Sequence, residues 1–410
     1  MSDIAEFLVN LMSAGNHHYQ VPDIERTKWI TKQLQEIGCQ CDCQVFDDTA
    51  NVYATFGNKD AKKNLCFCGH CDVVPARNWT KNPSGEIIGD RVYGRGAVDM
   101  LGGVACWFCA LKAFKENDIK NNTSILDNVK ITTFLTGDEE GNGTHGTVEA
   151  VEYLLKRGEK IDACIVGEPT SDYSVCEKNV SDLNNTLNFD KKKLDGVCYS
   201  RGGSFHFWIK INGKSGHVAY VGEFDNPITK AVKLCEQLKQ MDFKNFGHMT
   251  NLEIVEFDAT NNTDNVILDD VKIHGNVRFF SNSTKSKQIN SYDDSNLIQQ
   301  MIKNVCDNIL GENYQARYQC DRIGYSTNCD DDFLTLVMSC MKDYNQDARF
   351  TIVRGCTDGE YMKRISDSVC ELGLKCKMMH KIDEYVTIQD LHDLTRIYNN
   401  IITKYVAKNK

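Results

Sequence analysis

The sequence lacks a long uncharged apolar run. No stretch approaches the roughly 18 consecutive apolar residues that a membrane-spanning helix needs. The first residues carry Asp3 and Glu6 and have no basic segment ahead of an apolar one, so we expect no secretory signal there. We therefore expect a protein without a membrane partner.

An excess of positive charge is also absent. The chain has 47 Lys and Arg against 57 Asp and Glu, a formal net charge of −10. This balance disfavours nucleic acid as a partner, because a phosphate backbone attracts a basic face. Hydrophobic residues make up 41% and charged residues 25%, as in a globular protein. At 410 residues the chain is too long for one ordinary core, which predicts two domains.

Cysteine, by contrast, is abundant. The chain has 19 cysteines at scattered spacings, which together with the missing export signal predicts reduced thiols and a cytoplasmic protein. Cys106 and Cys109 have the C-x-x-C spacing of a redox motif, but they lie in an apolar helical run, so packing is the favoured interpretation. A redox protein would need a solvent-accessible thiol of lowered pKa at this pair.

Apolar patterns predict an α/β domain at both ends of the chain. We expect helices over 4–12, 23–37, 101–114, 148–156, 332–342 and 388–406, and strands over 39–46, 52–56, 65–69, 129–135, 163–167 and 349–353. Strands that alternate with helices favour a mixed, largely parallel sheet.

The middle of the chain has a different texture. A strand over 204–211, a helix over 227–241, strands over 249–257 and 271–280 and a helix over 296–310 give the order β-α-β-β-α. This order is typical of a small ferredoxin-like α+β domain. We therefore predict a discontinuous α/β domain made of 1–202 and 314–410, interrupted by an inserted domain over 203–313. The polar segment 178–195 is typical of a surface insertion.

Side chains capable of metal or proton chemistry are concentrated in five short segments. These are 69–72, 94–100, 137–141, 167–169 and 379–384. His70 and Asp72 end a predicted strand, and residues two apart in an extended segment face the same side. Open α/β sheets place their sites at the carboxyl ends of the strands, so these segments are candidates for one shared pocket.

The segments contain enough ligands for two divalent ions. His70, Asp99 and Glu168 could hold one ion. Asp99, Glu140 and His380 could hold a second, with Asp99 as the bridge. Two imidazoles and three carboxylates suit zinc or another first-row divalent ion such as cobalt. Each carboxylate alone is more often a helix cap or a solvated loop residue, but two adjacent ones after an apolar strand are costly to bury without a cation.

Two further carboxylates complete the hypothesis. Glu139 stays outside both ligand sets but next to one ligand, which is the position that a general base for hydrolysis requires. Asp72 lies two residues after His70, so it could orient that imidazole without binding an ion itself. Both residues are therefore predicted to be catalytic.

These segments resemble the zinc aminoacylase and carboxypeptidase family of metallopeptidases. The family's GH-x-D, GRG-x-x-D-M, DEE and GEP motifs match Gly69–Asp72, Gly94–Met100, Asp138–Glu140 and Gly167–Pro169, and its HK-x-NE motif matches His380–Glu384 with Asp383 in place of Asn. The resemblance extends from the first predicted helix to Val406. It implies a metal-bearing catalytic domain with an inserted dimerisation domain, two divalent ions per subunit and a homodimer.

Other segments resemble those of family members that remove an N-succinyl group. The residues that this resemblance assigns to substrate binding are Arg201, Asn265, Arg278, Gly355 and Cys356. His217 corresponds to a histidine that comes from the partner subunit and contacts the scissile amide. Two arginines suit a substrate with several carboxylates, because each can form a bidentate pair. Cys71 and Cys356 stand where the family has Thr, and Gly202 replaces a second arginine.

The resemblance implies metal-dependent hydrolysis of the amide of a small N-succinyl amino acid. Another N-acyl amino acid deacylase, such as an acetylornithine deacetylase, or a metal dipeptidase is the first alternative, against which Arg201 and Arg278 argue. The second alternative is a metal-free relative kept for binding. Such relatives lose ligands, whereas all five candidate ligands and the candidate base are present here.

Overall fold

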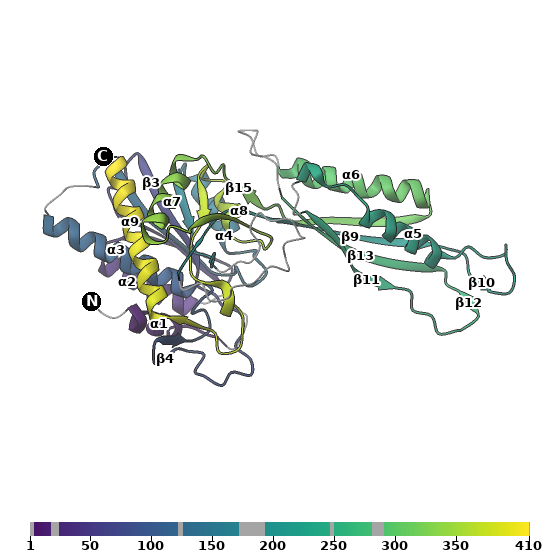
Figure 1. The fold of residues 1–410 in the computed structure, drawn as a ribbon, viewed down its shortest axis with the longest axis horizontal. Coiled ribbons are helices and arrows are strands. Elements are labelled where there is room, and N and C mark those ends of the chain that lie inside the picture. Colours follow the sequence, from purple (N-terminus) through teal and green to yellow (C-terminus); the bar gives the residue numbers. More distant parts are fainter. Residues whose placement is uncertain are drawn as a thin grey trace. The chain divides into compact units, whose positions relative to one another are not determined.

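The computed structural model of the protein describes residues 4–17, 24–121, 126–171, 193–246, 250–280 and 291–409. The chain folds into two compact units, both visible in Figure 1. The first comprises Met1–Ser200, Thr327–Val353 and Thr357–Lys410, and the second comprises Arg201–Ser326 and Arg354–Cys356. Most of the predicted surface insertion over 178–195 lies outside the described residues.

The first unit is a mixed α/β structure. Its helices are α1 (Ile4–Ser13), α2 (Ile24–Glu36), α3 (Leu101–Asn121), α4 (Thr147–Lys156), α7 (Asp332–Tyr344), α8 (Gly359–Met362) and α9 (Ile388–Lys408). Its strands are β1 (Gln40–Phe46), β2 (Thr49–Gly57), β3 (Lys63–His70), β4 (Glu86–Ile88), β5 (Arg91–Tyr93), β6 (Val129–Thr136), β7 (Ala163–Val166), β8 (Gly196–Arg201), β16 (Arg349–Val353), β17 (Val369–Glu371) and β18 (Tyr385–Thr387).

The main sheet of this unit is parallel at its centre and antiparallel at its margins. The strands follow the order β1-β2-β6-β3-β7-β17-β8, and β6, β3, β7 and β17 run parallel to one another. Strands β6 and β7 are buried along their whole length, as expected for parallel strands covered on both faces. A mixed sheet was predicted, and the fold class is confirmed.

Aromatic side chains fix the helices on this sheet. Trp107 of α3 stacks on Phe67 of β3 with ring centroids 4.9 Å apart, and Tyr398 of α9 packs edge-on against both rings. Cys106 lies in the same core, where burial raises the pKa of its thiol well above the usual value. Burial also raises the pKa of Cys109 to about 11. These shifts are opposite to what a redox pair needs, and the packing interpretation is confirmed.

The second unit has the predicted ferredoxin-like character, and its main sheet has one more strand than predicted. Its elements are β9 (Gly203–Asn212), β10 (Gly216–His217), α5 (Pro227–Lys239), β11 (Asn251–Asp258), β12 (Val266–Ile267), β13 (Asp270–Phe279), α6 (Ser291–Leu310), β14 (Tyr314–Arg322) and β15 (Tyr325–Ser326). The sheet order is β11-β13-β9-β14, and all three pairings are antiparallel. In the structure β14 pairs with β9, so this unit extends to Ser326, beyond the predicted boundary at 313.

The described part of the chain contains no helix that is both long and apolar enough to cross a membrane. All 18 cysteines in the described residues are free thiols.

Candidate active site

The candidate site is built on the carboxyl ends of three neighbouring parallel strands. In β3 and β6, His70 is the register partner of Thr136, and in β3 and β7, Cys68 is the partner of Val166. The loops that follow these strands therefore begin at the same edge of the sheet. They carry Asp72, the acidic pair Glu139 and Glu140, and Glu168.

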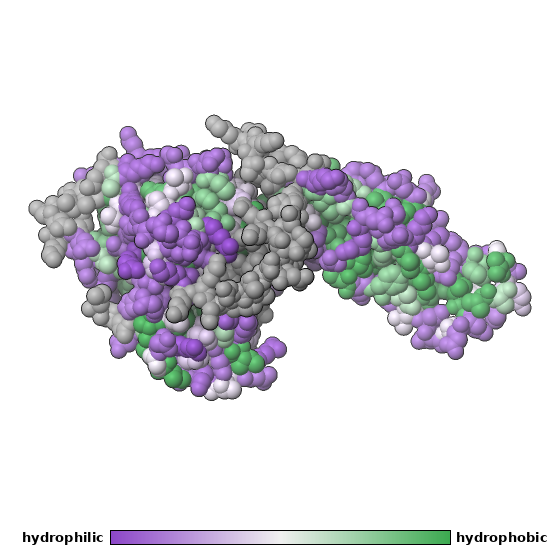
Figure 2. All heavy atoms as spheres, in the orientation of Figure 1, coloured by the Kyte–Doolittle hydropathy of each residue, from purple (hydrophilic) through white to green (hydrophobic). Residues whose placement is uncertain are grey.

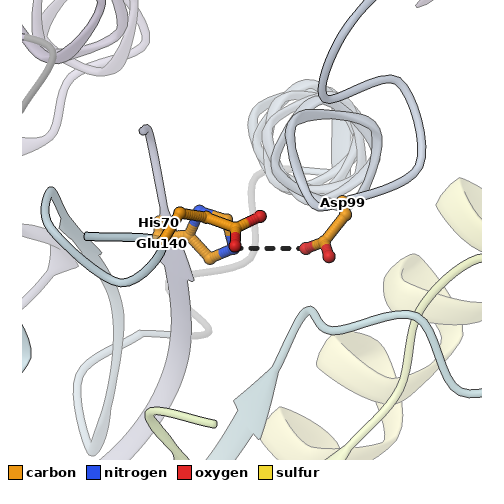
Figure 3. A group of neighbouring side chains, drawn as sticks. All are labelled: His70, Asp99 and Glu140. Carbon is orange, nitrogen blue, oxygen red and sulfur yellow. Dashed lines mark hydrogen bonds and ion pairs between the residues drawn. The ribbon is translucent and has the colours of Figure 1, made fainter. Parts of the chain in front are cut away.

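His70 is the centre of the first predicted ligand set. Its Nε2 lies 3.2 Å from Oδ1 of Asp99 and 3.7 Å from Oε1 of Glu168. Asp99 comes from the glycine-rich turn that precedes α3, and Figure 3 shows its carboxylate facing the imidazole beside Glu140. All three of His70, Asp99 and Glu168 are buried. A buried cluster of this composition requires positive charge to offset its carboxylates.

His380 joins the cluster from the loop before β18. Its Nε2 lies 3.0 Å from Oδ2 of Asp99 and 2.8 Å from Oε1 of Glu140. The two carboxylate oxygens of Asp99 thus face two different imidazoles, Oδ1 toward His70 and Oδ2 toward His380. This is the arrangement that a bridging carboxylate between two ions needs. The structure brings together all five of the residues that the sequence analysis selected as ligands.

Asp72 supports the cluster in two ways. The Nδ1–H of His70 donates to the backbone carbonyl of Asp72 at 2.9 Å, which leaves Nε2 directed toward the other ligands. The Asp72 carboxylate accepts the backbone N–H of Glu139 at 3.2 Å and of Glu140 at 2.8 Å. One buried side chain therefore holds the loop that carries both a ligand and the candidate base.

The raised pKa values in the cluster indicate a site that favours bound positive charge. Burial opposes protonation of His70, but the hydrogen bond to Asp99 and the charge of Asp72 outweigh it and raise the pKa of the imidazole well above its usual value. Hydrogen bonds to Asp99 and Glu140 raise the pKa of His380 to about 10. Burial, with the charge of Asp99, raises the pKa of Glu168 well above its usual value. Divalent ions would replace the protons that these groups hold.

Glu139 faces the same space. One carboxylate oxygen of Glu139, a ring nitrogen of His70 and one oxygen of Glu168 lie within 4.8 Å of one another. A second group within the same limit consists of His70, Asp99 and Glu140. Among the described residues, the donor set of imidazoles and carboxylates fits divalent metal ions. Glu139 is close enough to act on a water held in this cluster.

The sequence analysis assigned no role to two residues of the site, Glu384 and Arg95. The Glu384 carboxylate is fully buried and accepts a hydrogen bond from Nη1 of Arg95 at 2.7 Å. It also accepts backbone N–H groups of the turn that carries Asp99. Both residues lie inside the motifs described above, and the sequence signal was a glutamate four residues after the candidate ligand His380.

Four of the predicted substrate-binding residues lie together in the second unit. Nη1 of Arg278 lies 3.5 Å from Sγ of Cys356, whose thiol also lies 3.2 Å from the carbonyl oxygen of Gly202. Arg201 lies at the same turn, because a Cβ built on Gly355 would be 3.7 Å from its Nη1. Two guanidinium groups therefore flank one short turn.

The other two predicted residues of this unit form a separate pair. Nε2 of His217 lies 3.2 Å from Nδ2 of Asn265, and Nδ1 accepts the backbone N–H of Ala219 at 3.1 Å. His217 belongs to β10, which pairs with β12 just before β13 begins, whereas Arg278 lies near the end of β13. At about 3.3 Å per residue, the strand separates the two groups by roughly 25 Å.

Comparison with known proteins identifies the family. The model of peptidase family M20/M25/M40 matches residues 66–404, and the chain belongs to this family. It is 33% identical over 390 residues to a succinyl-diaminopimelate desuccinylase of Rickettsia bellii (strain RML369-C), an alignment that covers 92% of this chain and 90% of the relative. It is 32% identical over 391 residues to a protein of the same name from Pelagibacter ubique (strain HTCC1062), with coverage of 92% and 93%.

Solved structures agree on the fold. The aminopeptidase PepT from Bacillus cereus ATCC 10987 superimposes with a TM-score of 0.75 at 16% identity, covering 99% of this chain and 98% of that one. The Bacillus subtilis YXEP protein, described as a dinuclear metal-binding peptidase of the M20 family, gives a TM-score of 0.68 at 14% identity, with 98% of both chains covered. The predicted family membership is confirmed.

Proposed function

We propose that this protein hydrolyses the N-succinyl amide of N-succinyl-LL-2,6-diaminopimelate to succinate and LL-2,6-diaminopimelate, a step of diaminopimelate and lysine biosynthesis. The observation that carries the reaction is the position of Glu139 beside five candidate metal ligands at one edge of the sheet. The names of the relatives that align over more than nine tenths of the chain support the substrate.

The ligand cluster would hold two divalent ions, zinc or cobalt. When bound, such ions acidify a water molecule and polarise the amide carbonyl. Glu139 then accepts a proton from the attacking water and delivers it to the leaving amine. Asp72 keeps Glu139 in place through the backbone N–H that it binds. Cleavage of the amide thus needs one carboxylate that first acts as a base and then as an acid.

Selection of the substrate rests with the second unit. Arg201 and Arg278 flank the turn at Gly355 and Cys356 and would pair with substrate carboxylates. An acyl group that ends in a neutral methyl cannot form such a pair, so an N-acetyl substrate should be poor. A thiol at Cys356 is a weaker hydrogen-bond donor than a hydroxyl, which leaves more of the binding to the arginines.

We further propose a homodimer in which His217 of one subunit completes the site of the other. Within one second unit, His217 and Arg278 are too far apart to contact the same small substrate. The edge strand β11 also exposes apolar side chains, Val255 by 56% and Phe257 by 41%. Near His217, Val218, Val221 and Val266 are exposed, and Figure 2 shows an apolar surface at this end of the second unit. Such surfaces suit a protein partner.

The free cysteines of the described residues support a cytoplasmic location. The proposal is tested by release of succinate from N-succinyl-LL-2,6-diaminopimelate by the purified protein, with added zinc and after chelation. N-acetylornithine and dipeptides serve as competing substrates. Metal-dependent succinate release with little cleavage of the competitors is expected. Preferred cleavage of a competitor would show that the competitor's class is the true substrate. Activity that survives complete metal removal would overturn the mechanism.

A further inference from the structure

Glu384 lies beside the ligand cluster without being one of the candidate ligands, and its carboxylate accepts four hydrogen bonds. Its Oε1 accepts the backbone N–H of Val98 at 2.7 Å and of Asp99 at 3.2 Å. Its Oε2 accepts the N–H of Gly96 at 3.3 Å and Nη1 of Arg95 at 2.7 Å. A carboxylate with four donors and no exposure has one fixed geometry.

These four donors all belong to the turn that ends in Asp99, whereas Glu384 itself follows His380 by four residues. The backbone of the two segments is joined as well, because Gly94 N–H donates to the carbonyl of Glu384 at 3.0 Å. One side chain thus connects the two segments that supply Asp99 and His380, which meet at 3.0 Å.

The backbones of the two segments are also joined beside the turn, because β5 pairs with β18, with Tyr93 opposite Tyr385. Glu384 is the side chain that reaches the N–H groups of the turn itself. His380 has a positive φ of 60°, and 43% of its side chain is exposed, so local packing does not fix its loop. The turn of Asp99 is tightly packed at Gly96, where a Cβ would lie 2.7 Å from Leu101 and 2.8 Å from Val73. Packing therefore fixes the turn at Gly96, while Glu384 holds the backbone N–H groups of Val98 and Asp99 at its end.

We propose that Glu384 is a positioning residue that sets the distance between Asp99 and His380 and thereby the affinity of the site for its two divalent ions. The proposal rests on the proposed function, since it assumes that these residues hold metal. Glu384 contacts neither ion in this scheme. Its loss would weaken metal binding because Asp99 serves both ions, so a displaced turn affects both.

The test is zinc binding by the whole protein, measured by competition with a chelating dye, for Glu384→Gln and Glu384→Ala. The matched controls are Glu159→Gln and Glu159→Ala. Glu159 also accepts several donors, among them Lys130 at 2.5 Å and Asn64 at 3.2 Å, but it lies beside the first residues of β6, at the opposite end of that strand from the site. Thermal denaturation in chelator measures the structural cost of each variant.

We expect the Glu384 variants to bind zinc at least about tenfold more weakly than the wild type, as for other residues that orient ligands. The Glu159 variants should lose thermal stability and keep wild-type zinc affinity. Wild-type affinity in Glu384→Gln, or in Glu384→Ala if it folds, would overturn the positioning role. A wild-type protein that binds no zinc would instead overturn the proposed function, so the two failures are distinguishable.

Discussion

The carboxylate of Asp72 accepts the backbone N–H of Glu140 at 2.8 Å, and its backbone carbonyl accepts Nδ1–H of His70 at 2.9 Å. Asp72 therefore connects two strand ends that are far apart in the sequence and holds a candidate ligand on each of them. This connection explains why a residue that touches neither predicted ion could still control catalysis.

Asp72→Asn tests this connection. An asparagine keeps one acceptor oxygen but turns an NH2 group toward one of the two backbone N–H groups of Glu139 and Glu140. We expect metal affinity to fall about 10- to 100-fold, in the range found for residues that orient ligands. Zinc titration measures the change, and an unchanged affinity with normal turnover would show that the loop is held in another way.

Glu139→Gln separates the base from the ligands. Glutamine retains the shape of the side chain but cannot take a proton, so turnover should fall by about 10²- to 10⁴-fold. The metal content, measured by elemental analysis, should stay at the wild-type value. Loss of one ion per chain would show instead that Glu139 is a ligand, which its distance from His70 and Glu168 also permits.

Mixed dimers test the role of His217. Glu139→Gln and His217→Ala are each expected to be inactive as homodimers. If His217 acts across a two-fold interface, equal mixing after dissociation and reassociation should restore about a quarter of the wild-type activity, because half of the dimers are mixed and each has one complete site. If His217 acts in its own subunit, or if the protein is a monomer, mixing restores nothing.

Arg278→Lys tests recognition of the succinyl group. Lysine keeps the charge but loses the planar pair of donors, so KM for the succinylated substrate should rise by about tenfold or more with a smaller effect on kcat. KM for an N-acetyl substrate should not change, because it lacks the distal carboxylate. Equal effects on the two substrates would show that Arg278 recognises the amino-acid moiety that they share and not the acyl group.

A pH dependence is expected from the second unit. Burial lowers the pKa of His206 below 6.5, and the charges of His274 and Arg278 add to the effect while Asp321 opposes it. Below pH 6.5 the unfolded chain binds a proton at His206 more readily than the folded state does. The contribution of His206 to stability is therefore lost as the pH falls below 6.5. Urea midpoints at pH 7.5 and 5.5 should differ less in His206→Gln than in the wild type.

The ligands His70, Glu140 and Glu168 were predictable because they end or follow apolar strands. The runs that end at His70, Thr136 and Val166 are buried strands, and polar residues placed directly after such strands meet at one edge of a parallel sheet. His380 was selected for the metal-binding capacity of its side chain, and a family motif matched it afterwards. It precedes a strand of three residues, Tyr385–Thr387, which is too short to leave a pattern.

Two features were not predicted. Strand β14 does alternate, with Tyr314, Ala316, Tyr318 and Cys320 separated by polar residues, but it lies at an edge of the sheet and its inward face is only partly buried, so its apolar signal is weak. The contacts of Glu384 depend on the path of a turn 285 residues earlier in the chain, and no local pattern reports such a contact.

The pairing of β9 with β14 in the second unit has a consequence for the evolution of this protein. Ser204, near the start of β9, is the partner of Arg322, near the end of β14, so the chain enters and leaves this unit at neighbouring points. An insertion with adjacent ends can be lengthened, shortened or exchanged without redirecting the chain around it. The residues proposed to cut the amide and those proposed to select the acyl group can therefore diverge separately, so that one reaction can serve many metabolites.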